Sequence, residues 1–269
     1  MRFLEYKDRM INMAAKVTSY FIFTENFPIF DQLVLEEGFL RTTKNNLIWI
    51  NLGSPPSCVL GISSKVEEML NLPLAQEKGL TLIRRYSGGG TVVVDHKTIF
   101  VTFIANIKDF PIEPFPQHIM QWSKQFYFPI FKEGLFDLKE NDYVIGNKKF
   151  GGNAQYLTKN RFVHHSTLLW DYNQELMATL KRPKKAPNYR AEREHSDFLT
   201  TLKSVFETPQ DFVASFVEVL KTHFDLQMID VQKLQEQIIE PYRQSTHKLE
   251  AINFSHSDHQ SQTDQKMLV

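Results

Sequence analysis

The sequence contains a single cysteine, Cys58, in 269 residues. One thiol cannot close a disulfide within the chain or supply a cysteine-rich zinc site, and it fits a reducing compartment. No apolar run approaches the roughly 18 residues that a membrane-spanning helix needs. The first 17 residues alternate charged and apolar side chains and lack the apolar core of a secretory signal. We therefore expect a cytoplasmic protein with no membrane segment.

An excess of either charge is also missing, because 31 Lys and Arg residues balance 31 Asp and Glu residues. Without a dominant basic patch, we expect no nucleic-acid partner. A hydrophobic content of 42% and 22 Phe residues predict one sizeable, aromatic-rich core. From residue 255 onward, polar residues replace almost all apolar ones. We therefore predict a single catalytic domain over residues 1–254 and a disordered polar tail over residues 255–269.

The periodicity of apolar residues predicts both helices and strands. Helical spacing predicts helices over residues 27–43, 63–70, 117–132, 174–181 and 209–224, with Pro129 kinking the third. β-Branched and apolar runs predict strands over residues 47–52, 58–62, 82–86, 91–94, 98–104, 142–145, 148–157 and 161–172. The basic, proline-bearing segment 182–193 is expected to be an extended loop. Together these elements predict an α+β fold with a mixed β-sheet flanked by helices.

Three consecutive glycines, Gly88 to Gly90, follow Arg84, Arg85 and Ser87 between two strand-like runs. Glycine weakens a strand, so a triplet at this position needs a physical reason. Backbone N–H groups that converge on an anion are one such reason. A tight turn or a bulge between the strands is the alternative.

A second cluster combines Asn141-Asp142, Lys148-Lys149 and Gly151-Gly152. A lysine held on a hairpin strand beside bare backbone is suited to a phosphate or a polarised carbonyl, whereas a solvated hairpin lysine is the alternative. Asn141 and Asp142 suit a nucleotide or Mg²⁺, or simply a turn before a strand.

Two adjacent histidines, His164 and His165, fall in a predicted strand. Successive side chains of a strand point to opposite faces of the sheet, so both rings cannot serve one site. We expect one of the two to be a packed core residue.

Over residues 20–225 the order and spacing of these motifs resemble those of the lipoate–protein ligase A family, within the broader biotin/lipoate A/B ligases. The likeness is to the single-domain branch that shares Asn-Asp-Tyr-Val and Lys-Phe-Gly-Gly-Asn-Ala-Gln. The motifs are Arg84-Arg85-x-Ser87-Gly88-Gly89-Gly90-x-Val92-x-x-Asp95, Asn141-Asp142, Lys149-x-x-Gly152-x-Ala154 and His164-His165-x-Thr167-Leu168-Leu169.

The resemblance implies an enzyme that uses ATP and Mg²⁺ to activate lipoate, or octanoate, as an acyl-adenylate. The acyl group would then pass to a lysine on a lipoyl domain, of the 2-oxoacid dehydrogenase E2 or glycine cleavage H protein type. It also implies the catalytic-domain fold shared with biotin ligases and class II aminoacyl-tRNA synthetases.

The resemblance further implies a role for each matching position. Lys149 would be the catalytic residue, contacting the carboxylate and the α-phosphate, and Asp142 the nearest candidate for Mg²⁺. The other positions implied in substrate or nucleotide binding are Arg84, Arg85, Ser87, Gly88, Gly89, Gly90, Val92, Val93, Asn141, Asp142, Gly151, Gly152, Ala154 and His165.

Two departures from the family pattern leave alternatives open. Residues 61–65 read Gly-Ile-Ser-Ser-Lys, where such ligases commonly carry Gly-Arg-x-Gln-Asn. Few residues follow the helix predicted at 209–224, where two-domain ligases append a second domain. The alternatives are an acyltransferase that starts from a preformed acyl donor and a non-catalytic homologue that binds a lipoyl domain or a nucleotide. A thioester route would need Cys58 as nucleophile, but its apolar strand indicates a core residue.

Overall fold

The computed structural model describes residues 16–110, 112–182, 187–191 and 193–250. The tail predicted for residues 255–269 lies outside the described residues, so that prediction stays untested. No helix within the described ranges is long and apolar enough to cross a membrane.

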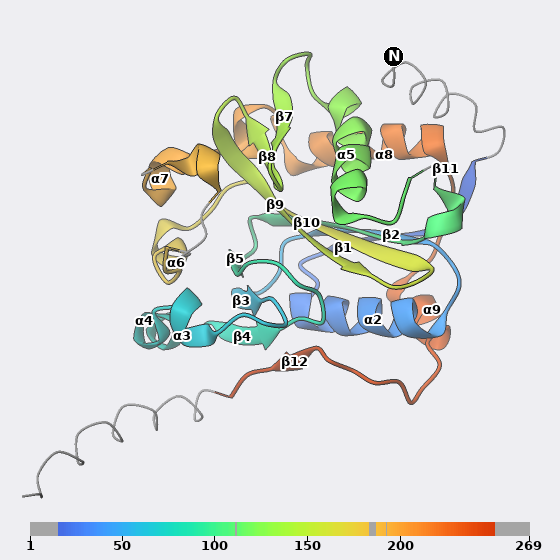
Figure 1. The fold of residues 1–269 in the computed structure, drawn as a ribbon, viewed down its shortest axis with the longest axis horizontal. Coiled ribbons are helices and arrows are strands. Elements are labelled where there is room, and N and C mark those ends of the chain that lie inside the picture. Colours follow the sequence, from blue (N-terminus) through green and yellow to red (C-terminus); the bar gives the residue numbers. More distant parts are fainter. Residues whose placement is uncertain (1–15, 111, 183–186, 192, 251–269) are drawn as a thin grey trace, which may run out of the picture.

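The larger of two sheets contains eight strands and forms the centre of the molecule (Figure 1). Its strands pair in the order β11 (Phe224–Met228), β1 (Val17–Glu25), β2 (Leu47–Leu52), β6 (Thr98–Asn106), β10 (Arg161–Leu169), β9 (Lys148–Leu157), β8 (Asp142–Ile145) and β7 (Phe136–Lys139). The β11–β1 and β1–β2 pairs are parallel, and the other pairs are antiparallel. This arrangement confirms the predicted mixed sheet.

A second sheet of four strands lies below one end of the first (Figure 1). It pairs β12 (His247–Lys248), β4 (Thr81–Arg84), β3 (Ser57–Leu60) and β5 (Val92–Val94) in that order. The pattern of apolar runs does not predict this division. The physical cause is the turn at residues 53–56, where Gly53 has φ +84° and two prolines follow, so that the chain leaves the large sheet after β2.

Helices cover both faces of the large sheet. In Figure 1, α5 (Pro116–Tyr127) and α8 (Pro209–His223) lie above it, while α2 (Ile29–Thr42) and α9 (Val231–Glu236) lie below. One aromatic core, with Phe103, Phe126 and Phe216, fills the α5 and α8 side. A second core, with Phe39 and Trp49, fills the α2 side. The aromatic-rich core is therefore confirmed, and the β6 strand between the two cores is buried on both faces.

The short helices differ in detail from the prediction. The helix expected at residues 63–70 is reduced to α3 (Val66–Met69), and a second helix, α4 (Leu72–Glu77), follows with Asn71 as its N-cap. The α5 helix ends at Tyr127, and Pro129 lies in a 3-10 turn (Phe128–Ile130), which agrees with the predicted disruption. The helix expected at residues 174–181 is α6 (Gln174–Met177), and α7 (His195–Phe198) was not predicted.

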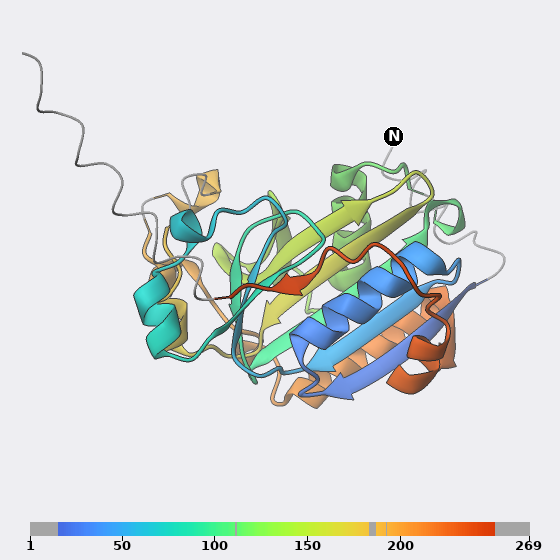
Figure 2. The same ribbon diagram turned by 90° about the horizontal axis from the view of Figure 1, so that it is seen from below.

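The C-terminal strap, defined here as residues 237–250, runs along α2 to the edge of β4 (Figure 2). Tyr242 Oη donates to the carbonyl of Val34, and β12 adds the edge strand next to β4. The sequence did not predict this strap, because its partner β4 lies more than 160 residues earlier and two-residue strands leave no periodicity. Strand β4 leads directly into Arg85 and the glycine triplet.

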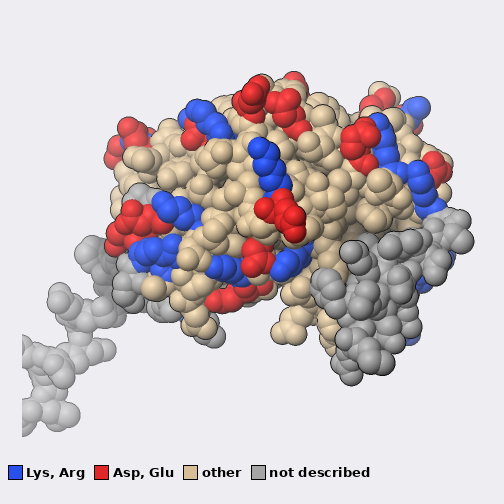
Figure 3. Space-filling view, turned by 90° about the horizontal axis from the view of Figure 1, so that it is seen from above, with Lys and Arg blue, Asp and Glu red and all other residues tan. Residues whose placement is uncertain are grey.

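On the face seen from above, acidic and basic side chains are interspersed over α5 and α8 (Figure 3). Neither charge forms a continuous patch on this face.

Candidate functional site

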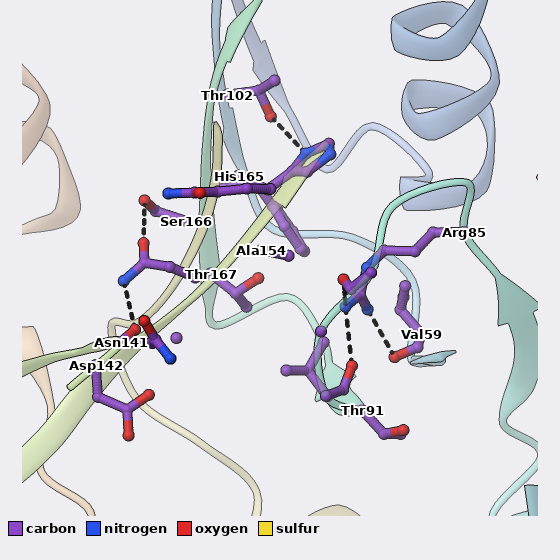
Figure 4. Close-up of a pocket in the computed structure, with 18 of the residues that line it drawn as sticks. Val59, Arg85, Thr91, Thr102, Asn141, Asp142, Ala154, His165, Ser166 and Thr167 are labelled. Carbon is purple, nitrogen blue, oxygen red and sulfur yellow. Dashed lines mark hydrogen bonds between the residues drawn. The ribbon is translucent and has the colours of Figure 1, made fainter. Parts of the chain in front are cut away.

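A cavity of about 590 Å³ lies between the two sheets. The small sheet and the segment after it supply Val59, Arg85 and residues 88–92, and the large sheet supplies Thr102, residues 152–155 and residues 165–167. In Figure 4, Arg85 and Thr91 lie on one side of this first cavity, with Ala154 and Thr167 opposite them. The two motif clusters predicted from the sequence therefore form facing walls of one cavity.

Arg85 supports the glycine segment, residues 88–91, through hydrogen bonds from its buried side chain. Its side chain is only 5% exposed, and its Nη2 donates to the carbonyl oxygens of Gly88 and Gly90 at 2.6 and 2.9 Å. Nε donates to Ser87 Oγ at 3.0 Å. Within the described ranges, the backbone N–H groups of residues 88–91 make no hydrogen bond to the protein. With its carbonyls bound to a cation, the segment therefore keeps amide donors available for an anion.

Gly61 and Gly89 account for the close approach of two backbone segments. Gly89 has φ +98°, a conformation that glycine adopts readily. A Cβ atom on Gly61 would lie 2.2 Å from the carbonyl oxygen of Gly89. The segment 61–65, which departs from the family pattern, is thus packed directly against the glycine triplet.

Arg84 and Ser87 are placed differently from the prediction. Neither residue lines the first cavity or a second cavity that adjoins it. Arg84 Nη1 donates to the carbonyl oxygens of Gly61, Ile62 and Ser64, and buried Ser87 accepts from Arg85. Arg84 ends an extended strand, so its side chain points to the side opposite that of Arg85, whereas Ser87 lies in the bend that follows and turns toward Arg85. These two side chains shape the loop instead of facing the cavity.

Lys149 points into the cavity from β9, where its Nζ lies 2.8 Å from Asp142 Oδ1 on β8. A bulge in the β8–β9 pairing leaves one residue, Phe150, unpaired between the Tyr143–Gly151 and Val144–Lys149 pairs. The Lys149 side chain lies over Gly152, whose added Cβ would meet Nζ at 3.2 Å. The hairpin and the need for bare backbone beside the lysine are as the sequence predicts.

Lys149 also lines a second cavity of about 680 Å³. Residues 89–92 and Gly152 border both cavities, so the lysine and the glycine segment stand at their junction. Apolar side chains of Met69, Met177 and Phe198 line the second cavity together with the cations Lys65, Lys181 and Arg190. Such a lining suits a ligand that carries both apolar surface and negative charge.

A buried polar chain borders the first cavity, and the sequence did not reveal it. Asn51 Nδ2 donates to Gln32, whose Nε2 donates to Glu36 at 2.8 Å. Glu36 Oε2 lies 3.2 Å from His165 Nδ1. The Nε2 atom of His165 is buried and has no hydrogen-bond partner among the described residues. Gln32 and Glu36 lie one helical turn apart on α2, a spacing that on its own reads as ordinary helix surface.

The two histidines of β10 face opposite sides of the sheet, as predicted. His164 is fully buried and contacts Tyr143 Oη at 3.0 Å, whereas His165 lines the cavity. Burial, with a smaller contribution from His165, lowers the pKa of His164 to about 3. His164 is therefore a neutral core residue.

Cys58 is fully buried in β3 and does not line the first cavity. Burial raises the pKa of its thiol to about 12, with Arg85 opposing the shift. A nucleophilic cysteine needs a lowered pKa and access to substrate. The prediction of a core cysteine is confirmed.

The remaining predicted positions line one cavity or both. Asn141, Asp142, Ala154 and His165 line the first; Val93 and Gly151 line the second; Val92 and Gly152 line both. Gly151 has a packing reason as well, because a Cβ there would meet Leu168 Cδ2 at 2.7 Å.

In the described part of the chain, no three His, Cys, Asp or Glu residues cluster in a way that could hold a metal ion. Lys149 and Tyr189 contact the two oxygens of Asp142. These residues do not fit a metal held by the protein, so a magnesium ion would have to be held mainly by phosphate oxygens.

The sequence matches the model of the lipoyl protein ligase A/B catalytic domain over residues 28–225. It is 27% identical to a Plasmodium falciparum protein called inactive lipoate–protein ligase 2, over 80% of this chain and 71% of that protein. It is 31% identical to a Bacillus subtilis lipoate–protein ligase, over 43% of this chain. That match spans only 34% of the Bacillus protein.

Solved structures share the fold. A lipoate–protein ligase A with bound ATP matches with a TM-score of 0.67 at 16% identity, over 82% of this chain and 92% of that one. Two structures from Thermoplasma acidophilum give similar matches. A bi-partite lipoate protein ligase with its E2 lipoyl domain gives 0.68 at 16% identity, over 83% and 91% of the chains. A putative lipoate protein ligase with bound lipoic acid gives 0.67 at 16% identity, over 82% and 92%. The protein belongs to the lipoyl protein ligase A/B catalytic-domain family.

Proposed function

We propose that the protein is a lipoate–protein ligase that activates lipoate, or octanoate, with ATP and transfers the acyl group to a lysine of a lipoyl domain. The observation that carries this proposal is the position of Lys149 at the junction of two cavities. The acyl chain would occupy the first cavity, where Ile29, Leu33 and Phe100 supply apolar surface. The nucleotide would occupy the second.

In the first step, a carboxylate oxygen of the acid attacks the α-phosphorus of ATP. The bond to the β-phosphate breaks, and pyrophosphate leaves. Negative charge on the α-phosphate oxygens grows in the transition state, and the Lys149 ammonium would stabilise it together with the amide groups of residues 88–91. The glycine segment holds these donors in place beforehand, because Arg85 fixes the carbonyls.

In the second step, the neutral amine of the acceptor lysine attacks the acyl carbonyl carbon. The bond between that carbon and the phosphate oxygen breaks, AMP leaves, and the amine nitrogen loses a proton. Lys149 would stabilise the departing phosphate charge as it did in the first step. Magnesium would accompany the nucleotide, and no step is assigned to Asp142 as its ligand.

The acceptor in this proposal is a lipoyl domain of the 2-oxoacid dehydrogenase E2 or glycine cleavage H protein type. A protein of the same fold, from Thermoplasma acidophilum, is described as a bi-partite lipoate protein ligase of a lipoylation system that includes its E2 lipoyl domain, which supports this choice of acceptor. We place the protein in the cytoplasm, in keeping with its single buried cysteine.

The proposal is tested by measuring acyl-adenylate formation and pyrophosphate release with lipoate, ATP and Mg²⁺. Lys149→Ala should lower the rate by about 100-fold or more, since removing one preorganised donor commonly costs that much. Lys148→Ala is the matched control, because Lys148 is exposed and lines neither cavity. Equal activity of Lys149→Ala and the parent would remove Lys149 from the mechanism.

A second candidate function is transfer from a preformed acyl-adenylate, or binding without turnover. The departure at residues 61–65 favours it, because this segment contacts the glycine triplet and borders the second cavity. A relative that carries the word inactive in its name points the same way. Supplying lipoyl-AMP directly would separate the candidates: transfer with lipoyl-AMP but not with lipoate and ATP would assign only the second step to this protein.

A further inference from the structure

The carboxylate of Asp142 is bound on both oxygens. Its Oδ1 atom lies 2.8 Å from the ammonium of Lys149, and Oδ2 accepts a hydrogen bond of 2.9 Å from Tyr189 Oη. Asp142 is only 6% exposed, so solvent screens these contacts weakly. A chain of three side chains therefore ends at the ammonium that stands between the two cavities.

Tyr189 reaches this chain from a separate part of the fold, the 3-10 turn Asn188–Arg190. Its ring packs against Phe198 with a centroid distance of 5.3 Å, and its carbonyl accepts from Arg193 Nη2 at 2.6 Å. The preceding N–H, of Asn188, donates to Glu140 at 2.7 Å. Burial and the nearby Asp142 charge raise the pKa of Tyr189, so the hydroxyl keeps its proton and donates.

The same part of the chain also holds the backbone of Lys149. The N–H of Thr200 donates to the Lys149 carbonyl at 2.8 Å, and Leu199 forms a parallel bridge with Lys149. The described part of residues 187–200 thus contacts Lys149 in two ways. It binds the backbone of Lys149 directly, and it reaches the ammonium by way of Asp142. Pro187 and Arg190 of this stretch line the second cavity.

We propose that Tyr189 is a positioning residue for Lys149 that acts through Asp142. Its hydroxyl donates a hydrogen bond to the carboxylate and so weakens the attraction between Asp142 and the Lys149 ammonium. The ammonium is then held in place, yet loosely enough to turn toward the carboxylate and phosphate oxygens of the substrates. Without the hydroxyl, Asp142 would direct its whole charge to Lys149 and hold it more tightly. The consequence for catalysis rests on the proposed ligase function.

The first test compares Tyr189→Phe with Tyr172→Phe. Both rings pack on the small cluster around Phe198, but among the described residues the Tyr172 hydroxyl bonds to neither Asp142 nor Lys149. We expect Tyr189→Phe to lower kcat for acyl-adenylate formation by about tenfold, which corresponds to one charge-assisted hydrogen bond. KM values for ATP and lipoate should stay within about twofold, and Tyr172→Phe should match the parent. An unchanged kcat in Tyr189→Phe would overturn the proposal.

A double variant separates action through Asp142 from a general loss of packing. If Tyr189 acts only on the carboxylate, adding Tyr189→Phe to Asp142→Asn lowers kcat no further than Asp142→Asn alone. A further tenfold loss in the double variant would show that Tyr189 acts by another route and would contradict the proposal.

An independent readout needs no catalysis and so tells a failure of this inference from a failure of the proposed function. The protein without substrates is treated with an amine-acetylating reagent, and acetylation of Lys149 and Lys148 is followed by mass spectrometry. A more tightly paired ammonium reacts more slowly, so the ratio of Lys149 to Lys148 acetylation rates should fall several-fold in Tyr189→Phe. It should not change in Tyr172→Phe. An unchanged ratio in Tyr189→Phe would overturn the inference even if the parent forms no adenylate.

Discussion

The charged side chain of Arg85 mainly stabilises the loop in which it lies. Its guanidinium donates to three carbonyl oxygens, of Val59, Gly88 and Gly90, and to Ser87 Oγ. Burial lowers its pKa to about 10, which still leaves it charged near neutral pH. Arg85 therefore affects the cavity mainly by fixing the shape of the glycine segment and leaving its backbone amide groups available.

At the same scale, Gly61 supports a prediction about stability. Gly61→Ala would place a Cβ 2.2 Å from the Gly89 carbonyl oxygen, a backbone atom that cannot turn away. We expect a loss of about 1–3 kcal/mol in the free energy of unfolding, typical of overpacking. Gly90→Ala is the control for folding, because no heavy atom lies within 4 Å of its added Cβ. Equal urea midpoints for the two variants would contradict this account of the loop contact.

His164 supports a prediction about pH. Its folded-state pKa of about 3 lies below the usual value near 6.5, so the unfolded chain binds more protons between these limits. The contribution of this residue to stability is therefore complete above pH 6.5 and declines as the pH falls toward 3. At pH 5 the loss is about 2 kcal/mol.

Urea unfolding at pH 7 and pH 5 measures this effect. The free energy of unfolding falls in the parent when the pH is lowered from 7 to 5. In His164→Gln this fall should be smaller by about 2 kcal/mol. If the parent and the variant lose the same amount, His164 is not the neutral buried group described here.

At the scale of elements, the C-terminal strap ties the last described residues to the start of the glycine segment. Glu37 on α2 is fully buried; its Oε1 accepts from Ser245 N and Arg41, and its Oε2 accepts from Thr246 N. Next to this anchor, β12 pairs with β4, and the N–H of Leu249 donates to the Leu82 carbonyl. The carboxylate thus holds the strap against the strand that leads to Arg85.

Replacing Glu37 with Gln removes the charge and sets an amide N–H₂ group against backbone donors. We expect a loss of about 3 kcal/mol in stability, as for a broken buried ion pair. Hydrogen exchange should accelerate at the amides of Ser245, Thr246 and Leu249, while those of β1 keep their relative protection. Glu236→Gln, at an exposed position, is the control. Unchanged protection of the strap amides in Glu37→Gln would refute the role of Glu37 as its anchor.

Elements with strong periodicity were predictable from the sequence, and those defined by distant partners were not. The apolar run of β6 and the capped stripe of α8 carry their own signals, including the capping box of Thr208 and Asp211. Strands β1, β7, β11 and β12 were missed. Three of them, β7, β11 and β12, are edge strands, and β11 and β12, of five and two residues, also depend on pairing with strands far away in sequence.

The site divides in the same way. Lys149, Gly152 and the glycine triplet could be assigned to one site because their motifs occur together in the order and spacing of the family, whereas each motif alone also fits a turn or a solvated lysine. Arg84 and Ser87 were assigned to the cavity because they belong to the motif, but the direction of a side chain depends on local geometry. Glu36 and Tyr189 were missed, since each gains its role only from a partner that the fold brings to it.

At the scale of the whole molecule, the two sheets supply the two halves of one site. The large sheet contributes Lys149, Asp142 and His165, and the small sheet leads into the glycine segment. The cavities meet at Lys149, so an acid from one side and a nucleotide from the other would join there. Both activation and transfer would depend on this shared position of Lys149.

Intact-mass analysis of a lipoyl domain tests the role of Lys149 in both steps. The domain is incubated with the protein, lipoate, ATP and Mg²⁺, in parallel with the Lys149→Ala and Lys148→Ala variants. We predict that the parent and Lys148→Ala add one lipoyl group to the acceptor lysine, and that Lys149→Ala adds none. An unmodified lipoyl domain after incubation with a folded, nucleotide-binding parent protein would contradict it.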